Sequence, residues 1–200
     1  RSEIDRRLGI PCVSHTRAAL KVLRTKGLAK SEADDVALSE AMLASAAAPT
    51  YFASRNLGSE HVIDGGVVAN APEMVGLVDA MGLNGAQLSR IEVLSIGTGN
   101  ASLARPPASA VRSGSAGWLV ARNLFEVTME AQEKLAQSQC SQILGQRYIR
   151  IDQSPSVKQA KVIGLDRANE TATKTLLDMA EACWEGLSVD RLRAIRAMLG

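Results

Sequence analysis

Short apolar runs that end in glycine are the feature that most limits the folds open to this chain. The run IEVLSI (91–96) is nearly continuous in apolar residues, as a strand covered on both faces requires, and Gly97-Thr98-Gly99 closes it. HVID (61–64) and RYIRI (147–151) are further short candidate strands. Helical patterns stand between these runs, so the sequence predicts an α/β fold with helices on the faces of a sheet.

The helical segments are marked by composition and by capping residues. The segment 36–49, VALSEAMLASAAAP, is rich in Ala, Leu and Met and stops at a proline, which predicts a closely packed helix. Asn70 with Glu73 three positions later resembles a capping box for a helix that ends at Gly82. Further helices are predicted over about 117–138, from Asp166 onward, and after the cap residue Ser188.

The first 35 residues are harder to assign. SHTRAALKVLR fits a basic amphipathic helix, but a strand around LKVLRT fits as well. We therefore expect a basic N-terminal segment of undecided structure over 1–35, followed by an α/β region over 36–200. No repeat or linker divides the chain further.

Charge and composition narrow the choice of partner. Lys and Arg number 23 against 21 Asp and Glu, and aromatic residues make up 3%, so neither a strong phosphate-binding field nor a set of base-stacking side chains is evident. Nucleic acid is not the expected partner. Residues 1–30 nevertheless carry eight Lys or Arg against Glu3 and Asp5, which fits a solvated face or contact with acidic lipid headgroups.

The number and spacing of the cysteines, together with the hydropathy of the chain, indicate the cellular compartment. Cys12, Cys140 and Cys183 are odd in number and far apart, which argues against a disulfide framework and a clustered metal site. No run reaches 18 apolar residues, and RSEIDRRLGI lacks the apolar middle of a signal peptide. We expect a cytoplasmic protein or one bound peripherally to a membrane.

Asp64 is the principal candidate for chemistry. It ends the HVID run, and Gly65 and Gly66 follow it directly. An Asp before two glycines can simply start a tight turn by hydrogen-bonding nearby amides. Alternatively, an acid at the carboxyl end of a strand lies where α/β folds place their ligand sites, and it can act as a general base if burial raises its pKa. His61 would point to the opposite face of the strand, so a Ser/His/Asp triad is poorly supported.

Three segments, in order, resemble the patatin-like phospholipase family: ASAAAPTYF (44–52), VIDGGVVANAP (62–72) and VLSIGTG (93–99). RYIRID (147–152) and GLDRANETATKTLLDMAE (164–181) resemble the late strand and helix of that family, so the likeness covers roughly residues 36–185. It implies a lipid acyl hydrolase with a Ser/Asp dyad. Asp64 matches the aspartate of the dyad, which takes the proton of the serine, and no histidine or cofactor takes part.

The serine of that dyad is not found in this sequence. The family carries it in a Gly-x-Ser-x-Gly elbow upstream, preceded by a glycine-rich segment that supplies the oxyanion hole. The nearest imitation, SGSAG (113–117), has Ser113 in place of the first glycine and lies downstream of Asp64. We therefore expect the sheet to be incomplete, the serine to lie on another segment, and these 200 residues alone to be inactive. An exposed sheet edge would then favour a complementing N-terminal polypeptide or a homo-oligomer.

Two other functions remain open at this stage. A patatin fold without its nucleophile could serve as a catalytically inactive binding or scaffolding module. An α/β nucleotide-binding protein could use the Gly-Thr-Gly turn, although no P-loop lysine or complete dinucleotide motif follows it.

Overall fold

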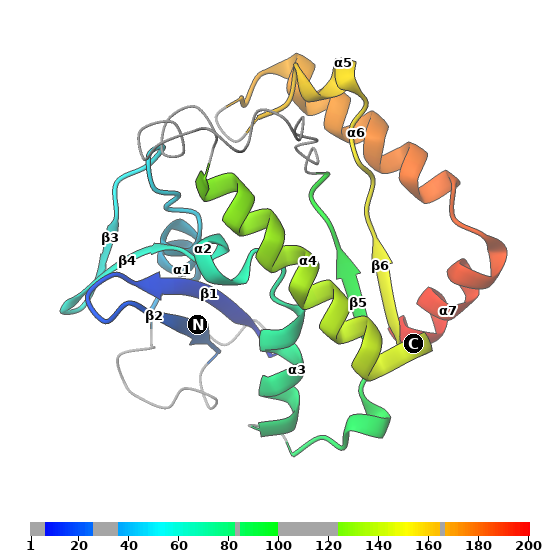
Figure 1. Ribbon diagram of the computed structural model, residues 1–200, viewed down its shortest axis with the longest axis horizontal. Coiled ribbons are helices and arrows are strands. Elements are labelled where there is room, and N and C mark those ends of the chain that lie inside the picture. The colour runs from blue at the N-terminus through cyan, green and yellow to red at the C-terminus, as the bar shows by residue number, and fades with distance from the viewer. Residues whose placement is uncertain (1–6, 26–35, 83–84, 100–123, 165–166) are drawn as a thin grey trace, which may run out of the picture. The chain divides into compact units, whose positions relative to one another are not determined.

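The structure is a computed structural model that describes residues 7–25, 36–82, 85–99, 124–164 and 167–200 (Figure 1). The chain separates into two compact units. The first contains the described residues up to Gly85 together with 124–138, and the second contains the described residues of 86–99 together with 139–200. Each unit is described by itself.

The first unit is built on a four-stranded antiparallel sheet with the order β2-β1-β4-β3 (Figure 1). In its register Cys12 lies opposite Lys21 on one neighbour and opposite Asp64 on the other. The strands are β1 (Gly9–Ser14), β2 (Ala19–Arg24), β3 (Arg55–Leu57) and β4 (Glu60–Asp64). The first two fall in the segment that the sequence left undecided, and its strand alternative, around LKVLRT, is observed as β2.

Helix α1 (Leu38–Ser45) closes the core of this unit. It supplies small side chains, which let the helix approach the sheet closely because nothing bulky stands between the two backbones. The core residues are Cys12, Leu23, Ala41, Ala44 and Val62, with Ile10, Val36 and Leu57 packed against them. The Ala-rich composition of this segment therefore has the packing role that the sequence predicts.

Two helices follow β4 directly. The short α2 (Gly66–Ala69) comes first and α3 (Glu73–Gly82) second. Arg24 at the end of β2 binds both carboxylate oxygens of Asp79 on α3, each at 2.8 Å, which fixes this helix to the sheet. The predicted capping box is not observed. Asn70 instead forms the C-cap of α2, and its side chain turns toward α4 (Leu124–Leu144), whose residues up to Ser138 belong to this unit.

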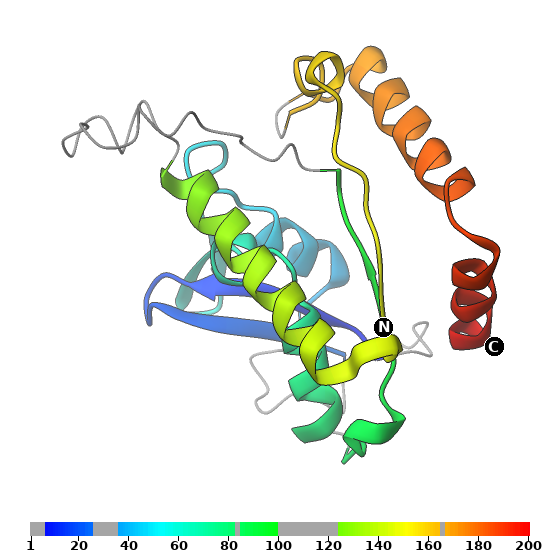
Figure 2. The same ribbon diagram turned by 45° about the vertical axis from the view of Figure 1, so that its right-hand side comes forward.

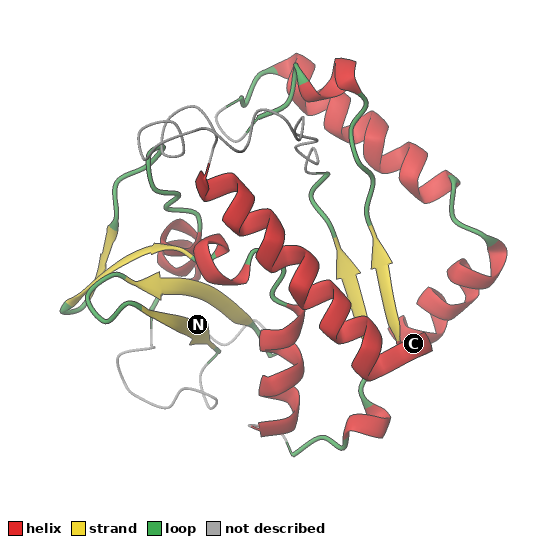
Figure 3. Cartoon of the chain, in the orientation of Figure 1, coloured by secondary structure: helices red, strands yellow, loops and turns green. Residues whose placement is uncertain are grey.

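The second unit is built on a parallel pair of strands, β5 (Val93–Ile96) and β6 (Tyr148–Ile151) (Figure 2). Arg147 donates to the backbone carbonyls of Leu88 and Ile91, which fastens the start of β6 to the segment before β5. The other elements, with helices red in Figure 3, are the 3-10 helices η2 (Leu88–Arg90) and η5 (Gly145–Arg147) and the α-helices α5 (Val157–Ala160), α6 (Glu170–Glu185) and α7 (Val189–Leu199).

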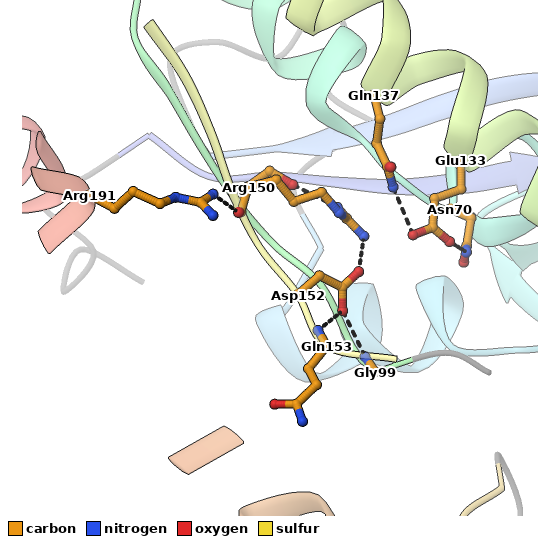
Figure 4. Close-up of polar contacts among 9 residues, drawn as sticks. Asn70, Gly99, Glu133, Gln137, Arg150, Asp152, Gln153 and Arg191 are labelled. Atoms are coloured by element: carbon orange, nitrogen blue, oxygen red, sulfur yellow. Dashed lines mark hydrogen bonds and ion pairs between the residues drawn. The ribbon is translucent and has the colours of Figure 1, made fainter. Parts of the chain in front are cut away.

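A carboxylate occupies the carboxyl ends of these two strands (Figure 4). Asp152 follows β6, and its Oδ2 pairs with Arg150 at 2.6 Å. Its Oδ1 accepts from the backbone amides of Gln153 at 2.9 Å and Gly99 at 3.3 Å. A Cβ added at Gly97 would lie 2.0 Å from Cγ of Asp152, so only glycine fits there. The carboxylate of Asp152 thus fills the space beside the Gly-Thr-Gly turn and binds the amide of Gly99.

The fold confirms the α/β class and most of the predicted elements. The predicted strands are β4, β5 and β6, and Ser188 caps α7 by accepting from the amide of Arg191. Helix α6 begins later than predicted, because Asn169 is its N-cap. The SGSAG segment with Ser115, and the predicted helix before residue 124, lie outside the described residues.

We expect Gly97→Ala to destabilise the protein by about 1–3 kcal/mol, the usual cost of forcing a side chain into a filled space. The double variant Gly97→Ala/Asp152→Ala should recover part of this loss, since it removes the atoms that the methyl group meets. Denaturant unfolding of both variants and of Asp152→Ala tests the coupling. Simple additivity of the two single effects would contradict the crowding argument.

Candidate active site

Asp64 is the last residue of β4, and α2 begins two residues later at Gly66. The backbone on both sides of this junction is tied to the turn that follows α1. The amide of Asp64 donates to the carbonyl of Ala47 at 3.0 Å, and the amide of Gly65 donates to the carbonyl of Ser45 at 3.2 Å. The corner is therefore fixed by main-chain hydrogen bonds, whatever side chain it carries.

The two glycines leave room for close neighbours. A Cβ at Gly65 would lie 2.2 Å from the carbonyl oxygen of Pro11, so β1 passes too close for any side chain. A Cβ at Gly66 would lie 2.9 Å from Cε of Met129 and 3.0 Å from Oδ1 of Asp64. These close approaches explain the Asp-Gly-Gly sequence without invoking unusual backbone angles.

The electrostatics of the corner suit a base. Asp64 is half-buried, and its Oδ1 accepts one short hydrogen bond, 2.6 Å long, from the amide of Gly66. Burial raises the pKa of the Asp64 carboxyl, and the Gly66 hydrogen bond lowers it by less, so the pKa lies above its ordinary value. A carboxylate with increased proton affinity can accept a proton from a hydroxyl group placed beside it.

Histidine does not assist Asp64 in the described part of the chain. His61 is exposed and lies opposite Asn56 of β3, and His15 is exposed beyond the end of β1. Across the described ranges, no group of three or more His, Cys, Asp or Glu side chains is arranged to hold a metal ion. Among the same residues, no helix has the length and apolar character needed to cross a membrane.

Several residues that surround Asp64 were not predicted from the sequence. The carbonyls of Ser45 and Ala47 fix the corner from one side, whereas the sequence marked the ASAAAP stretch that contains them only as part of a packed helix and by family resemblance. The side chain of Ser45 also donates to the carbonyl of Pro11 at 2.7 Å. Asn70 and Glu133, which hydrogen-bond to each other at 2.8 Å, are 63 positions apart, so no local pattern could have paired them.

Together, these features define an α/β protein that presents a half-buried carboxylate at a strand-to-helix corner, held by backbone hydrogen bonds. Comparison with known proteins relates this chain to a protein family. Residues 2–77 match the family model for patatin-like phospholipases.

Two curated relatives extend this match beyond residue 77. The chain is 30% identical over 179 residues to a cGAMP-activated phospholipase of Pseudomonas aeruginosa (strain BWHPSA011 / Pa011), which covers 88% of this chain and 53% of that protein. It is 30% identical over 156 residues to a cGAMP-activated phospholipase of Vibrio cholerae serotype O1 (strain ATCC 39315 / El Tor Inaba N16961), covering 70% and 44%. The chain thus spans about half the length of the curated relatives it matches. These matches support a patatin-like family for this chain.

The raised pKa of Asp64 predicts how the stability of the protein changes with pH. The folded state holds the Asp64 proton to higher pH than the unfolded state, so the free energy of unfolding falls as pH rises between the two pKa values. Above the pKa of the folded state, the cost of the buried charge is fully present. Asp64→Asn should therefore have a higher Tm than the wild type at pH 7, with the difference disappearing in acid. A lower Tm at pH 7 would contradict this sign.

Gly65→Ala should disrupt the corner. Its methyl group would meet backbone atoms of Pro11, so we expect a loss of at least about 1–3 kcal/mol in stability. Gly76→Ala on α3 is the matched control, because a Cβ there meets nothing within 4 Å. The control should be neutral or gain about 0.5–1 kcal/mol from the higher helix propensity of alanine. Equal stability of the two variants in denaturant unfolding would show that the close approach is absent.

Proposed function

We propose that the protein containing this chain is a lipid acyl hydrolase of the phospholipase type, with Asp64 as the base of a Ser/Asp dyad. The observation that carries the proposal is the position of Asp64. It is a half-buried acid with a raised pKa at a glycine corner, in a chain of the patatin-like family. Fatty acyl esters such as phospholipids are the proposed substrates, because the family model and both relatives are named as phospholipases.

In the proposed reaction, the hydroxyl oxygen of a serine attacks the ester carbonyl while Asp64 takes the hydroxyl proton. The proton then passes to the departing alcohol, and the acyl group remains on the serine. Water attacks this ester in turn and gives up a proton to Asp64, which passes the proton to the serine oxygen as the bond to the acyl group breaks, so that the fatty acid leaves and the serine hydroxyl is restored. The serine and the oxyanion donors are proposed to lie on a segment outside these 200 residues, so that Asp64 is the contribution of this chain.

The names of the two relatives suggest how such an enzyme is controlled. Both are cGAMP-activated phospholipases, and their matches cover 88% and 70% of this chain. We extend this to the present protein as part of the proposal. Assays are therefore best run both with and without cGAMP, so that an enzyme that needs the nucleotide is not scored as inactive.

Asp64→Asn in the intact protein should abolish hydrolysis of a short-chain nitrophenyl ester, since asparagine keeps the size of the side chain and loses the base. Removal of a catalytic base typically costs about 10²–10⁴ in kcat. Asp190→Asn is the matched control, because its side chain is 92% exposed on α7 and plays no part in the corner. Asp64→Asn with near-normal turnover would refute the role of Asp64. Inactive wild type, with and without cGAMP, would favour a binding or scaffolding module.

A further inference from the structure

A hydrogen-bonded pair connects α4 to the corner that carries Asp64 (Figure 4). Nδ2 of Asn70, at the end of α2, donates to Oε2 of Glu133 at 2.8 Å. The other oxygen of Glu133, Oε1, accepts from the side-chain amide of Gln137 one turn further along α4, at 2.9 Å. Both oxygens of the carboxylate are therefore engaged, which holds the Glu133 side chain in one position.

This pair fixes which way the Asn70 amide faces. A carboxylate only accepts hydrogen bonds, so the NH₂ group of Asn70 must face Glu133, and its carbonyl oxygen must face elsewhere. Oδ1 of Asn70 lies 3.1 Å from the point that a Cβ of Gly66 would occupy. Oδ1 of Asp64 lies 3.0 Å from the same point. The amide of Asn70 thus reaches the space beside the candidate base.

Helix α2 needs such a contact. It is only four residues long, and its N-cap residue, Gly65, has no side chain to cap the first turn. A helix of this length has too few internal hydrogen bonds to be stable alone, so tertiary contacts must hold it. The amide of Gly66, which hydrogen-bonds to Asp64, is the first of this helix, and Asn70 ends it. A contact that fixes Asn70 consequently limits the movement of Asp64.

We propose that Asn70, oriented by Glu133, is a positioning residue that holds the Asp64 corner in its reactive geometry. The inference rests on the proposed function, because positioning matters only if Asp64 accepts a proton. The other explanation is that the pair merely fastens α4 to α2 within the first unit. That role predicts a loss of stability without a selective loss of kcat.

The test uses the intact protein and a short-chain nitrophenyl ester, with cGAMP present and absent. Asn70→Ala and Glu133→Ala should each lower kcat by about tenfold to a hundredfold with KM within about twofold, because a small misplacement of a catalytic group slows the chemical step. The double variant should be no slower than the slower single variant, since both changes break the same bond. Lys134→Ala is the matched control. It removes an exposed ion pair to Glu130 on the same helix and should leave kcat unchanged.

Conservative variants separate positioning from general damage. Glu133→Gln keeps an acceptor for Asn70 and should stay within about threefold of the wild-type kcat. Asn70→Asp places a second carboxylate against Glu133 and should be severely impaired. Asn70→Asp/Glu133→Gln restores a donor and an acceptor in exchanged positions, so it should recover much of the kcat lost in Asn70→Asp. Because this comparison is made between two variants, it remains informative even if the alanine variants fold poorly.

Three results would overturn the inference: an unchanged kcat in the alanine variants, equal losses in Glu133→Gln and Glu133→Ala, or no recovery in the exchanged pair. Asp64→Asn, assayed in parallel, shows which proposal has failed. If Asp64→Asn is inactive while the Asn70 and Glu133 variants are normal, only the positioning inference is wrong. If Asp64→Asn keeps its turnover, the dyad is wrong and the positioning inference falls with it.

Discussion

The main-chain hydrogen bonds from Asp64 and Gly65 to the turn after α1 are the contacts on which the candidate site depends. They set the path of the backbone as it leaves β4, while the direction of the carboxylate depends on the contacts of the Asp64 side chain. Gly65 makes this possible by letting β1 approach to a distance that no Cβ would allow. The core between α1 and the sheet, built from residues such as Ala44 and Val62, holds the turn against the strand. The geometry of the Asp64 corner and the packing of the core are thus secured by the same short segment.

The sequence revealed those elements that carry a local signal. A continuous apolar run and a terminal glycine turn were enough to predict β5, and a serine cap was enough to predict α7. The hairpin of β1 and β2 was ambiguous because LKVLR fits both helical and alternating patterns, and only pairing with a neighbouring strand decides between them. Asn70 was misread for a related reason. The sequence alone does not distinguish an asparagine that caps a helix from one that binds a distant carboxylate. Glu133, the partner of Asn70, lies 63 positions further along the chain.

Two acids end strands in this chain, and their surroundings give them different properties. Asp152 is bound by Arg150 and by two backbone amides, so its oxygens are occupied in closing the Gly-Thr-Gly turn. Asp64 has no basic partner among the described residues and accepts one amide. In sequence both are an aspartate at the end of a short strand-like run, HVID for Asp64 and RYIRID for Asp152. Only the three-dimensional contacts separate an acid that is used for structure from one that is suited to accept a proton.

The hydrogen bond from Gly66 to Asp64 links protonation to local order. Because this bond lowers the proton affinity of the carboxylate, uptake of a proton must weaken the bond by the same free energy. Protonation of Asp64 therefore weakens its hydrogen bond to the first amide of α2, and deprotonation strengthens this bond. The charged form of Asp64 therefore holds this turn more firmly than the protonated form does.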